Sequence, residues 1–385
     1  MSYDVIDRIS IGTLCTAIAD CSRGRTRLSI NQYLSDSGIV AEGKNVAYFN
    51  YGRNALYTLF REKFAGKEVI FPGFVCPTVV IAAIKAGVKP RFADVNLDDF
   101  NLDIDFISPE DLMKADALFL NHTFGVPADM DKIRRKLKGS DTYLIEDIAQ
   151  ALFSTYKGEY VGRLGDVTLL SMYKQIPNLN GALLLSDFKV DEPVSGAISL
   201  GNLTRLLWIT SGPHDYLIKA VRQRKGLPGA LNELQENLTS RRPSQFALSL
   251  FAILLPSLKD AVERRRIIAR HYHERASESR YLVPQQVDAV KKPSWFNFSV
   301  RLLPEIAHIR DALLIGLRRQ GVFGDRLWHD SPVAINMFQD YLQNDYPSAR
   351  LLAKSVINLP IKADYRESDA DYLFGVIERT IQKLV

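Results

Sequence analysis

Between residues 50 and 186, short apolar stretches alternate with stretches whose apolar residues recur at helical spacing. The apolar stretches have the length of buried strands, and they read EVIFP, PRFADV, ADALFLNH, TYLIED, GDVTLLS and GALLLSD. The stretches PTVVIAAIKAG and ADMDKIRRKLKG lie between them and end in glycine, which is typical of helices. This alternation predicts an α/β fold with a mostly parallel sheet and helices on both faces.

The C-terminal part of the chain has a different pattern. Helical spacing continues from Pro243 to about Ser279, and the next stretches read as strand, helix, strand and helix: FNFSVRLLP, RDALLIGLRRQG, INLPI and DADYLFGVIERTIQKL. We therefore predict a large α/β domain over residues 1–255 and a smaller α+β domain over residues 256–385. Residues 1–45 are an N-terminal extension in this scheme, and they show no clear period until about residue 40.

Composition places the chain among ordinary globular proteins, with 46% hydrophobic and 24% charged residues in 385. The net charge is +5, and a basic cluster such as ERRR (Glu263–Arg266) lies in a helical pattern, where a solvated helix face is the simpler interpretation. We therefore expect no nucleic-acid partner. A weak positive field suits small anionic substrates instead.

Cysteine content and the longest apolar run bear on the compartment. Cys15, Cys21 and Cys76 are an odd number without metal-ligand spacing, which favours a reducing compartment and predicts no metal site. The N-terminus lacks a signal-peptide pattern. The run RPSQFALSLFAILLPSLK is shorter between its polar ends than the ~20 residues that span a bilayer. The sequence predicts a cytoplasmic protein without a membrane segment.

Candidate functional residues follow predicted strands, where an open parallel sheet binds its ligands. Lys174 is a single amine between two apolar strands in LLSMYKQIPNLNGALLL, and Ser171 ends the first of these strands. Asp147 ends the strand TYLIED, and Gln150 follows it by three residues. A further candidate is the turn NYGRN, whose Gly52, Arg53 and Asn54 open a helix and suit an anion.

Each candidate also has an ordinary structural interpretation. Lys174 could be a solvated turn lysine, Asp147 could cap the following helix, and a glycine before a helix is common. Together, however, an amine, an acid for a ring nitrogen and a phosphate cradle describe a site for pyridoxal phosphate, whose aldehyde forms an imine with lysine. The chain has no GxGxxG after a strand, no GxxxxGK[ST] and no zinc-ligand spacing.

The sequence resembles the DegT family of fold-type-I aminotransferases. The likeness lies in VIFPGFVCPTVVIAAIKAGVKPRFADVNLDDFNLD, NHTFGVPADMDKI and YLIEDIAQALFSTYKGEYVGRLGDVTLLSMYK, and it extends over roughly residues 45–385. The resemblance implies a cofactor domain with a seven-stranded sheet, a smaller C-terminal domain and a homodimer with interface active sites. It also implies transfer of an amino group from an amino donor, with glutamate expected, to a nucleotide-linked keto-sugar, as in polysaccharide or lipopolysaccharide biosynthesis.

The resemblance assigns roles to four of the candidates. Asp147 matches the acid at the pyridine nitrogen, Gln150 the amide beside the ring oxygen, and Ser171 the serine near the phosphate. Lys174 matches the Schiff-base lysine when positions are counted backward from Gly181. Counted forward from Ser171, Ile176 would take its place, so we infer a two-residue deletion before the lysine.

Several positions depart from the family pattern. Arg53 replaces a hydroxyl residue, and an arginine can bind phosphate through two hydrogen bonds. Cys76 occupies the place of the aromatic residue that stacks on the cofactor ring, with Phe74 and His122 as neighbouring candidates. The expected substrate contacts are His122, Arg242, which would reach the partner's site, and Trp328 and His329, which stand in a loop that usually contains tyrosine.

Two further hypotheses stand beside the aminotransferase, in which Lys174 would shuttle a proton. The shortened spacing between Ser171 and Lys174 and the altered turn at Arg53 leave open a non-catalytic homologue that acts as a partner-binding or regulatory scaffold. A dehydratase of this family would have histidine in place of the lysine, and no histidine lies near residue 174.

Overall fold

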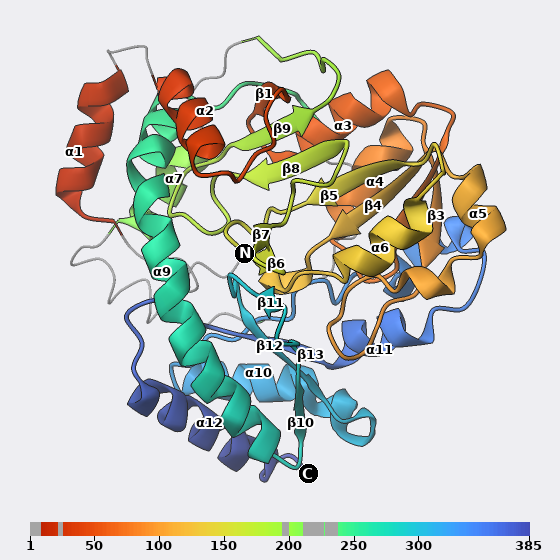
Figure 1. Cartoon of the computed structure of the whole chain (residues 1–385). Helices are drawn as coiled ribbons and strands as arrows, with labels where there is room; N and C mark the ends of the chain where they lie inside the picture. Colours follow the sequence, from red (N-terminus) through yellow and green to blue (C-terminus); the bar gives the residue numbers. More distant parts are fainter. Residues whose placement is uncertain (1–8, 22–25, 195–199, 211–226, 228–237) are drawn as a thin grey trace.

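The computed structural model describes residues 9–21, 26–194, 200–210, 227 and 238–385 (Figure 1). Its strands are β1 (Asn45–Phe49), β2 (Glu68–Pro72), β3 (Lys89–Ala93), β4 (Ala117–Asn121), β5 (Tyr143–Asp147), β6 (Thr155–Tyr156), β7 (Glu159–Tyr160), β8 (Val167–Ser171), β9 (Ala182–Ser186), β10 (Leu282–Pro284), β11 (Lys291–Lys292), β12 (Phe298–Leu302) and β13 (Val356–Leu359). The central sheet has seven strands in the order β1-β9-β8-β5-β4-β2-β3. All of them except β9 run in one direction. This confirms the predicted mostly parallel α/β sheet.

Helices cover both faces of this sheet. The helices are α1 (Ile11–Asp20), α2 (Thr26–Asp36), α3 (Gly52–Lys63), α4 (Pro77–Lys85), α5 (Pro109–Lys114), α6 (Met130–Leu137), α7 (Leu200–Ile209), α9 (Gln245–Glu278), α10 (Arg310–Arg319), α11 (Pro347–Ser355) and α12 (Glu367–Ile381). On one face, Phe119 of β4 packs in a cluster with residues of α3 and α4. On the other, its neighbour Leu118 packs with residues of α5 and α6. Successive strand residues alternate between the faces, so the apolar strands require helices on both.

The C-terminal part contains a second sheet, the antiparallel β10-β12-β13. Its core includes Tyr272 of α9, Leu313 of α10 and Phe374 of α12. Figure 1 shows this unit beside the far end of α9 from the large sheet. The division into a large domain and a smaller α+β domain stays a prediction. The predicted boundary at residue 255 falls inside α9, whose Phe251 belongs to a cluster under the large sheet. One helix therefore contributes to both cores.

The N-terminal extension contains two helices that the sequence pattern did not predict. In α1, the side chain of Ser10 accepts a hydrogen bond from the Thr13 amide at 3.1 Å, and Ala17 is buried in a cluster with Phe246 of α9. In α2, Ile30 and Leu34 pack against the large sheet. Only Asp20 in α1 carries a charge, so its apolar face does not stand out in the sequence.

Among the described residues, α9 is the one helix that is long and apolar enough to cross a membrane by length and composition. The same test is passed by core helices of proteins that do not enter membranes. Half of its most apolar window is buried within the protein, and Leu250, Phe251 and Leu255 of that window are core residues. The apolar segment of α9 is therefore a helix that packs in the core, as the sequence predicted.

Candidate active site

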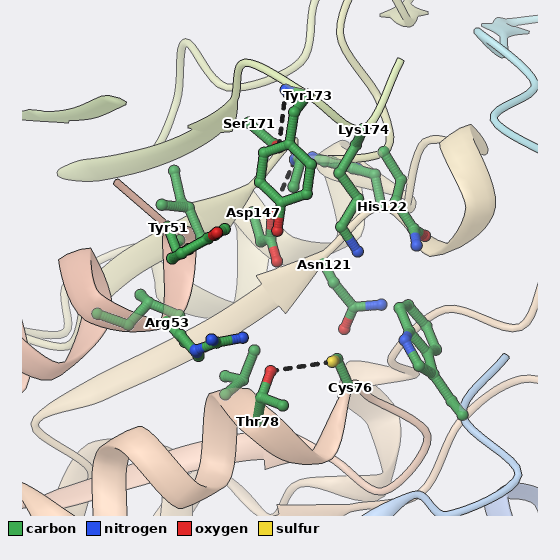
Figure 2. Close-up of a pocket in the computed structure, with 17 residues that line it drawn as sticks. Tyr51, Arg53, Cys76, Thr78, Asn121, His122, Asp147, Ser171, Tyr173 and Lys174 are labelled. Atoms are coloured by element: carbon green, nitrogen blue, oxygen red, sulfur yellow. Dashed lines mark hydrogen bonds between the residues drawn. The ribbon is translucent and has the colours of Figure 1, made fainter. Parts of the chain in front are cut away.

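A pocket lies at the carboxyl ends of β4, β5 and β8, next to the first turns of α3 and α4 (Figure 2). The predicted site residues that line it are Gly52, Arg53, Cys76, His122, Asp147, Gln150, Ser171, Lys174 and Trp328. The remaining lining residues are Tyr51, Leu56, Thr78, Val79, Asn121, Ala149, Leu169 and Tyr173. The strand ends and helix starts singled out in the sequence therefore meet in one cavity.

Lys174 reaches this pocket from the loop that follows β8. Figure 2 shows its amino group in the same space as the side chains of Asp147 and Asn121. Ile176, the alternative position in the forward count from Ser171, is 2% exposed and packs in the apolar cluster that contains Leu170. The structure therefore brings the lysine at 174, and not position 176, to Asp147.

Asp147 is the last residue of β5, and its Oδ1 accepts a hydrogen bond from the Ala149 amide at 2.8 Å. Burial raises the pKa of this carboxyl, while the Ala149 amide and the charge of Lys174 act in the opposite direction. Burial has the largest effect because it removes water that would stabilise the ion. A cation next to the carboxylate would reverse this shift.

Gln150 presents a hydrogen-bond donor to the pocket. Its Oε1 accepts a hydrogen bond from the Phe124 amide at 3.1 Å. A backbone N–H can only donate, so the oxygen must lie on that side and the nitrogen Nε2 on the other. Nε2 is buried and has no hydrogen-bond partner among the described residues. A buried donor without a partner is costly, so this geometry suits a ligand oxygen at the pocket.

The starts of α3 and α4 form a candidate anion site. The residues before the two helices, Tyr51 and Cys76, provide no side-chain cap. Pro77 opens α4 without an N–H, and the Asn54 and Val79 amides donate to the Tyr51 and Cys76 carbonyls at 3.1 Å. The Gly52 and Thr78 amides are therefore the candidate donors to an anion. Gly52 packs closely here, since an added Cβ would lie 3.3 Å from Leu169 Cδ2. Arg53 and the Ser171 side chain also line this region. Helix N-termini combined with a guanidinium favour a phosphate group.

Three predicted site residues do not line the pocket. Asn54 turns its amide nitrogen toward Asn50 Oδ1 at 2.8 Å and the Thr239 carbonyl at 2.9 Å. Arg242 forms an ion pair with Glu192 at 3.2 Å. His329 lies 3.0 Å from the Arg326 carbonyl through Nδ1, and burial lowers the pKa of its imidazole.

His122 lines the pocket with both ring nitrogens engaged. Its Nδ1 accepts a hydrogen bond from the Ala128 amide at 3.1 Å, which leaves the proton on Nε2. Nε2 lies 3.3 Å from Oε2 of the buried Glu146. The imidazole can therefore offer its ring surface to a ligand, whereas neither nitrogen is available.

Aromatic side chains form one wall of the site. Trp328 stacks on Phe124 with ring centroids 4.8 Å apart, and Phe74 packs edge-on against both. Trp328 and Phe124 have positive φ angles of 62° and 57°, which are strained for bulky side chains. Cys76 lines the pocket beside this group, with its Sγ 3.1 Å from Thr78 Oγ1. Trp328 thus brings an aromatic side chain to the pocket in which the resemblance implied one at position 76.

The sequence did not single out Asn121 or Tyr173, although both follow from their place at the ends of β4 and β8. Asn121 is the last residue of β4 and lies opposite Asp147 in the parallel ladder. Tyr173 precedes Lys174, and burial raises the pKa of its phenol to about 12, so it is a hydrogen-bond donor at neutral pH.

A model of the DegT/DnrJ/EryC1/StrS aminotransferase family matches residues 41–181 and 244–378. The chain belongs to this family. It is 24% identical over 368 residues to the spore coat polysaccharide biosynthesis protein SpsC of Bacillus subtilis, with 92% of this chain and 90% of SpsC covered.

Solved structures of similar fold include both aminotransferases and dehydratases. Helicobacter pylori PseC, an aminotransferase involved in the biosynthesis of pseudoaminic acid, has a TM-score of 0.76 at 15% identity, with 98% of this chain and 99% of PseC covered. E. coli GDP-4-keto-6-deoxy-D-mannose-3-dehydratase with bound hydrated PLP has a TM-score of 0.74 at 18% identity, with 97% and 98% covered. At these identities the likeness shows the fold.

Membership of the DegT/DnrJ/EryC1/StrS family confirms the predicted enzyme class and cofactor. The family comprises PLP-dependent aminotransferases and dehydratases that act on nucleotide sugars. The residues of this pocket fit that cofactor on three separate points. Asp147 needs a cation, Gln150 Nε2 needs an acceptor, and the first turn of α3 suits a phosphate.

Proposed function

We propose that this protein is an aminotransferase that moves an amino group from glutamate to a nucleotide-linked keto-sugar, and that Lys174 is the lysine that bonds pyridoxal phosphate. The observation that carries the proposal is that the side chains of Lys174 and Asp147 share one pocket at the carboxyl edge of the sheet. When bound, pyridoxal phosphate supplies an aldehyde for the amino group and a ring that takes up electrons.

Each group in the pocket has a role in holding this cofactor. The Asp147 carboxylate holds the positive charge of the ring nitrogen, which removes the penalty that burial places on its own charge. Gln150 Nε2 donates to the ring oxygen. The amides at the start of α3, the Arg53 guanidinium and the Ser171 hydroxyl bind the phosphate.

Lys174 also moves the proton. As a free amine, its Nζ takes a proton from the α-carbon of the amino donor and delivers a proton to the carbonyl carbon of the sugar. This role favours the aminotransferase over a dehydratase, which would have histidine at this position. His122, the histidine in the pocket, has both ring nitrogens engaged and cannot replace the amine.

Fewer residues of the pocket are candidates for contact with the sugar substrate. Trp328 lines the pocket and offers an aromatic surface to a nucleotide-linked sugar. We further propose a cytoplasmic homodimer in which Arg242 and His329, which lie outside the pocket of their own chain, serve an interface site. Light scattering tests the dimer, since a mass of twice 43.4 kDa is expected and a monomeric mass at the concentration of the assay would contradict it.

Absorption spectroscopy tests the proposed reaction. Purified protein with added pyridoxal phosphate is expected to show a visible band, and glutamate is expected to bleach it as the amino group passes to the cofactor. The Lys174→Ala variant should show no such band. Lys189→Ala removes an exposed lysine near β9 and is the matched control, which should bleach like the wild type.

The outcomes separate the candidate functions. A band that forms and does not bleach with glutamate would mean another amino donor or another reaction of the same cofactor. The absence of a band in the wild type would contradict the enzyme and favour the scaffold.

A further inference from the structure

Asn121 carries a buried oxygen that nothing in the described structure satisfies. It is the last residue of β4, lies opposite Asp147 in the ladder and lines the pocket. The residue is 4% exposed, and its Oδ1 has no hydrogen-bond partner among the described residues. A buried acceptor without a partner is destabilising, so a protein keeps one where its working state supplies a donor.

The orientation of this amide is fixed by its neighbours. Asn121 Nδ2 lies 2.7 Å from Thr123 Oγ1. The Thr123 hydroxyl has one proton, which it donates to the Phe100 carbonyl at 3.1 Å, so toward Asn121 it can only accept. The amide nitrogen must therefore face Thr123, and the oxygen must face the pocket.

The cofactor of the proposed function offers no donor for this oxygen. Its phosphate and ring oxygens accept hydrogen bonds, and its ring N–H belongs to Asp147. The protein donors are also assigned: Gln150 Nε2 faces the ring oxygen, and Arg53 and Ser171 face the phosphate. The Tyr173 and Thr78 hydroxyls and the Lys174 amine also line the pocket, and of these donors the amine is the one that Figure 2 shows beside the Asn121 amide. This amine has up to three N–H donors, and its Nζ lies 5.9 Å from the centroid of the Phe296 ring.

Figure 2 places the Lys174 amine and the Asn121 amide in the same part of the pocket. We propose that Asn121 is a positioning residue for Lys174, whose amino group donates a hydrogen bond to Asn121 Oδ1 whenever it is not bonded to the cofactor. The inference rests on the proposed function, because only a lysine that is released during each turnover needs a second partner. The bond would hold the amine beside the carbon at which it moves protons.

A spectroscopic titration with three variants tests this assignment. Asn121→Leu keeps the size of the side chain and removes the acceptor, while the Asp147, Gln150 and phosphate contacts remain. We expect this variant to bind pyridoxal phosphate and form the visible band. At fixed 2-oxoglutarate it should need about 10-fold more glutamate for half-bleaching, because the released amine has lost its hydrogen bond. The melting temperature of each variant reports on folding.

Two other variants separate positioning from a structural role. Thr123→Val removes the group that anchors Asn121 Nδ2 but leaves the oxygen, so we expect a smaller rise in the glutamate requirement. Asn121→Asp puts a negative charge beside the released amine, which stabilises its protonated form, so half-bleaching should need less glutamate than in the wild type. A purely structural effect would raise the glutamate requirement in this variant as well.

The possible failures can be told apart. If the wild type bleaches and Asn121→Leu bleaches at the same glutamate concentration and pH, the oxygen serves the sugar or a water molecule, and the inference is wrong. If the wild type forms no band, the proposed function fails, and the assignment of Asn121 fails with it.

Discussion

Asp147 is a carboxyl group whose charge is unfavourable until a cation reaches it. Burial raises its pKa despite the Ala149 amide and the nearby charge of Lys174. A raised pKa means that the folded protein holds this proton more tightly than the unfolded chain. The free energy of unfolding of the cofactor-free protein should therefore fall as the pH rises from the ordinary value of 3.8 through the raised pKa.

Asp147→Asn should consequently change stability and cofactor binding in opposite directions. We expect the cofactor-free variant to be at least as stable as the wild type at neutral pH, with a difference that grows as the pH rises through the window above. Its affinity for pyridoxal phosphate should fall by about 10-fold or more, because the ring nitrogen loses its counter-charge. Urea unfolding at several pH values and an absorbance titration measure the two effects. A destabilised cofactor-free variant would contradict this account.

At the scale of elements, the first turns of α3 and α4 form the candidate anion site, and Arg53 adds a guanidinium to it. The contact of Arg53 with the Tyr51 ring, 4.8 Å from the guanidinium carbon to the ring centroid, holds the side chain on the pocket side. We propose that this guanidinium takes the place of the hydroxyl group that the family resemblance implies at position 53.

Arg53→Gln should weaken binding of pyridoxal phosphate about 10-fold and leave binding of pyridoxal, which lacks the phosphate, unchanged. The difference between the two ligands isolates the phosphate contact from any change in the pocket. Equilibrium titration of the visible band with each aldehyde measures it. Equal losses for both ligands would show that Arg53 acts on the pocket in another way.

The sequence predicted elements better than side-chain directions. Strand ends identified Asp147, Ser171 and Lys174, because parallel strands bring their carboxyl ends to one edge. The sequence did not show that Asn54 points away from the pocket. Successive helical residues are rotated by about 100° from one another, so Arg53 and Asn54 cannot both face the pocket. The sequence also did not show that Trp328 lines the pocket and that His329 does not. The direction of the Trp328 side chain depends on its positive φ and on its packing against Phe124.

At the scale of the whole molecule, the pocket is shared between the two halves of the chain. Trp328 comes from the predicted C-terminal domain, yet it lies in the same apolar cluster as Phe74 and Phe119 of the large sheet. The segment around α11 follows it into that cluster through Ala349 and Leu352. Contacts between these distant parts of the sequence set the geometry of the aromatic wall. A division of the chain near residue 255 places the two sides of these contacts in different domains.

Trp328→Ala should therefore weaken the fold and the site together. We expect a loss of about 3 kcal/mol in the free energy of unfolding, since a stacked and buried indole is replaced by a cavity. Trp328→Phe retains the stacking and is the control, with a smaller loss. Urea unfolding measures both. If Trp328→Ala were as stable as the wild type, the C-terminal segment would not be packed on the large sheet as described.

The most direct test of the whole account is to identify the lysine that carries the cofactor. The protein is loaded with pyridoxal phosphate, treated with borohydride to fix the linkage, digested and mapped by mass spectrometry. The account predicts that the phosphopyridoxyl group lies on the peptide that contains Lys174, next to the pocket of Asp147. Its appearance on another lysine, or on none, would contradict the account.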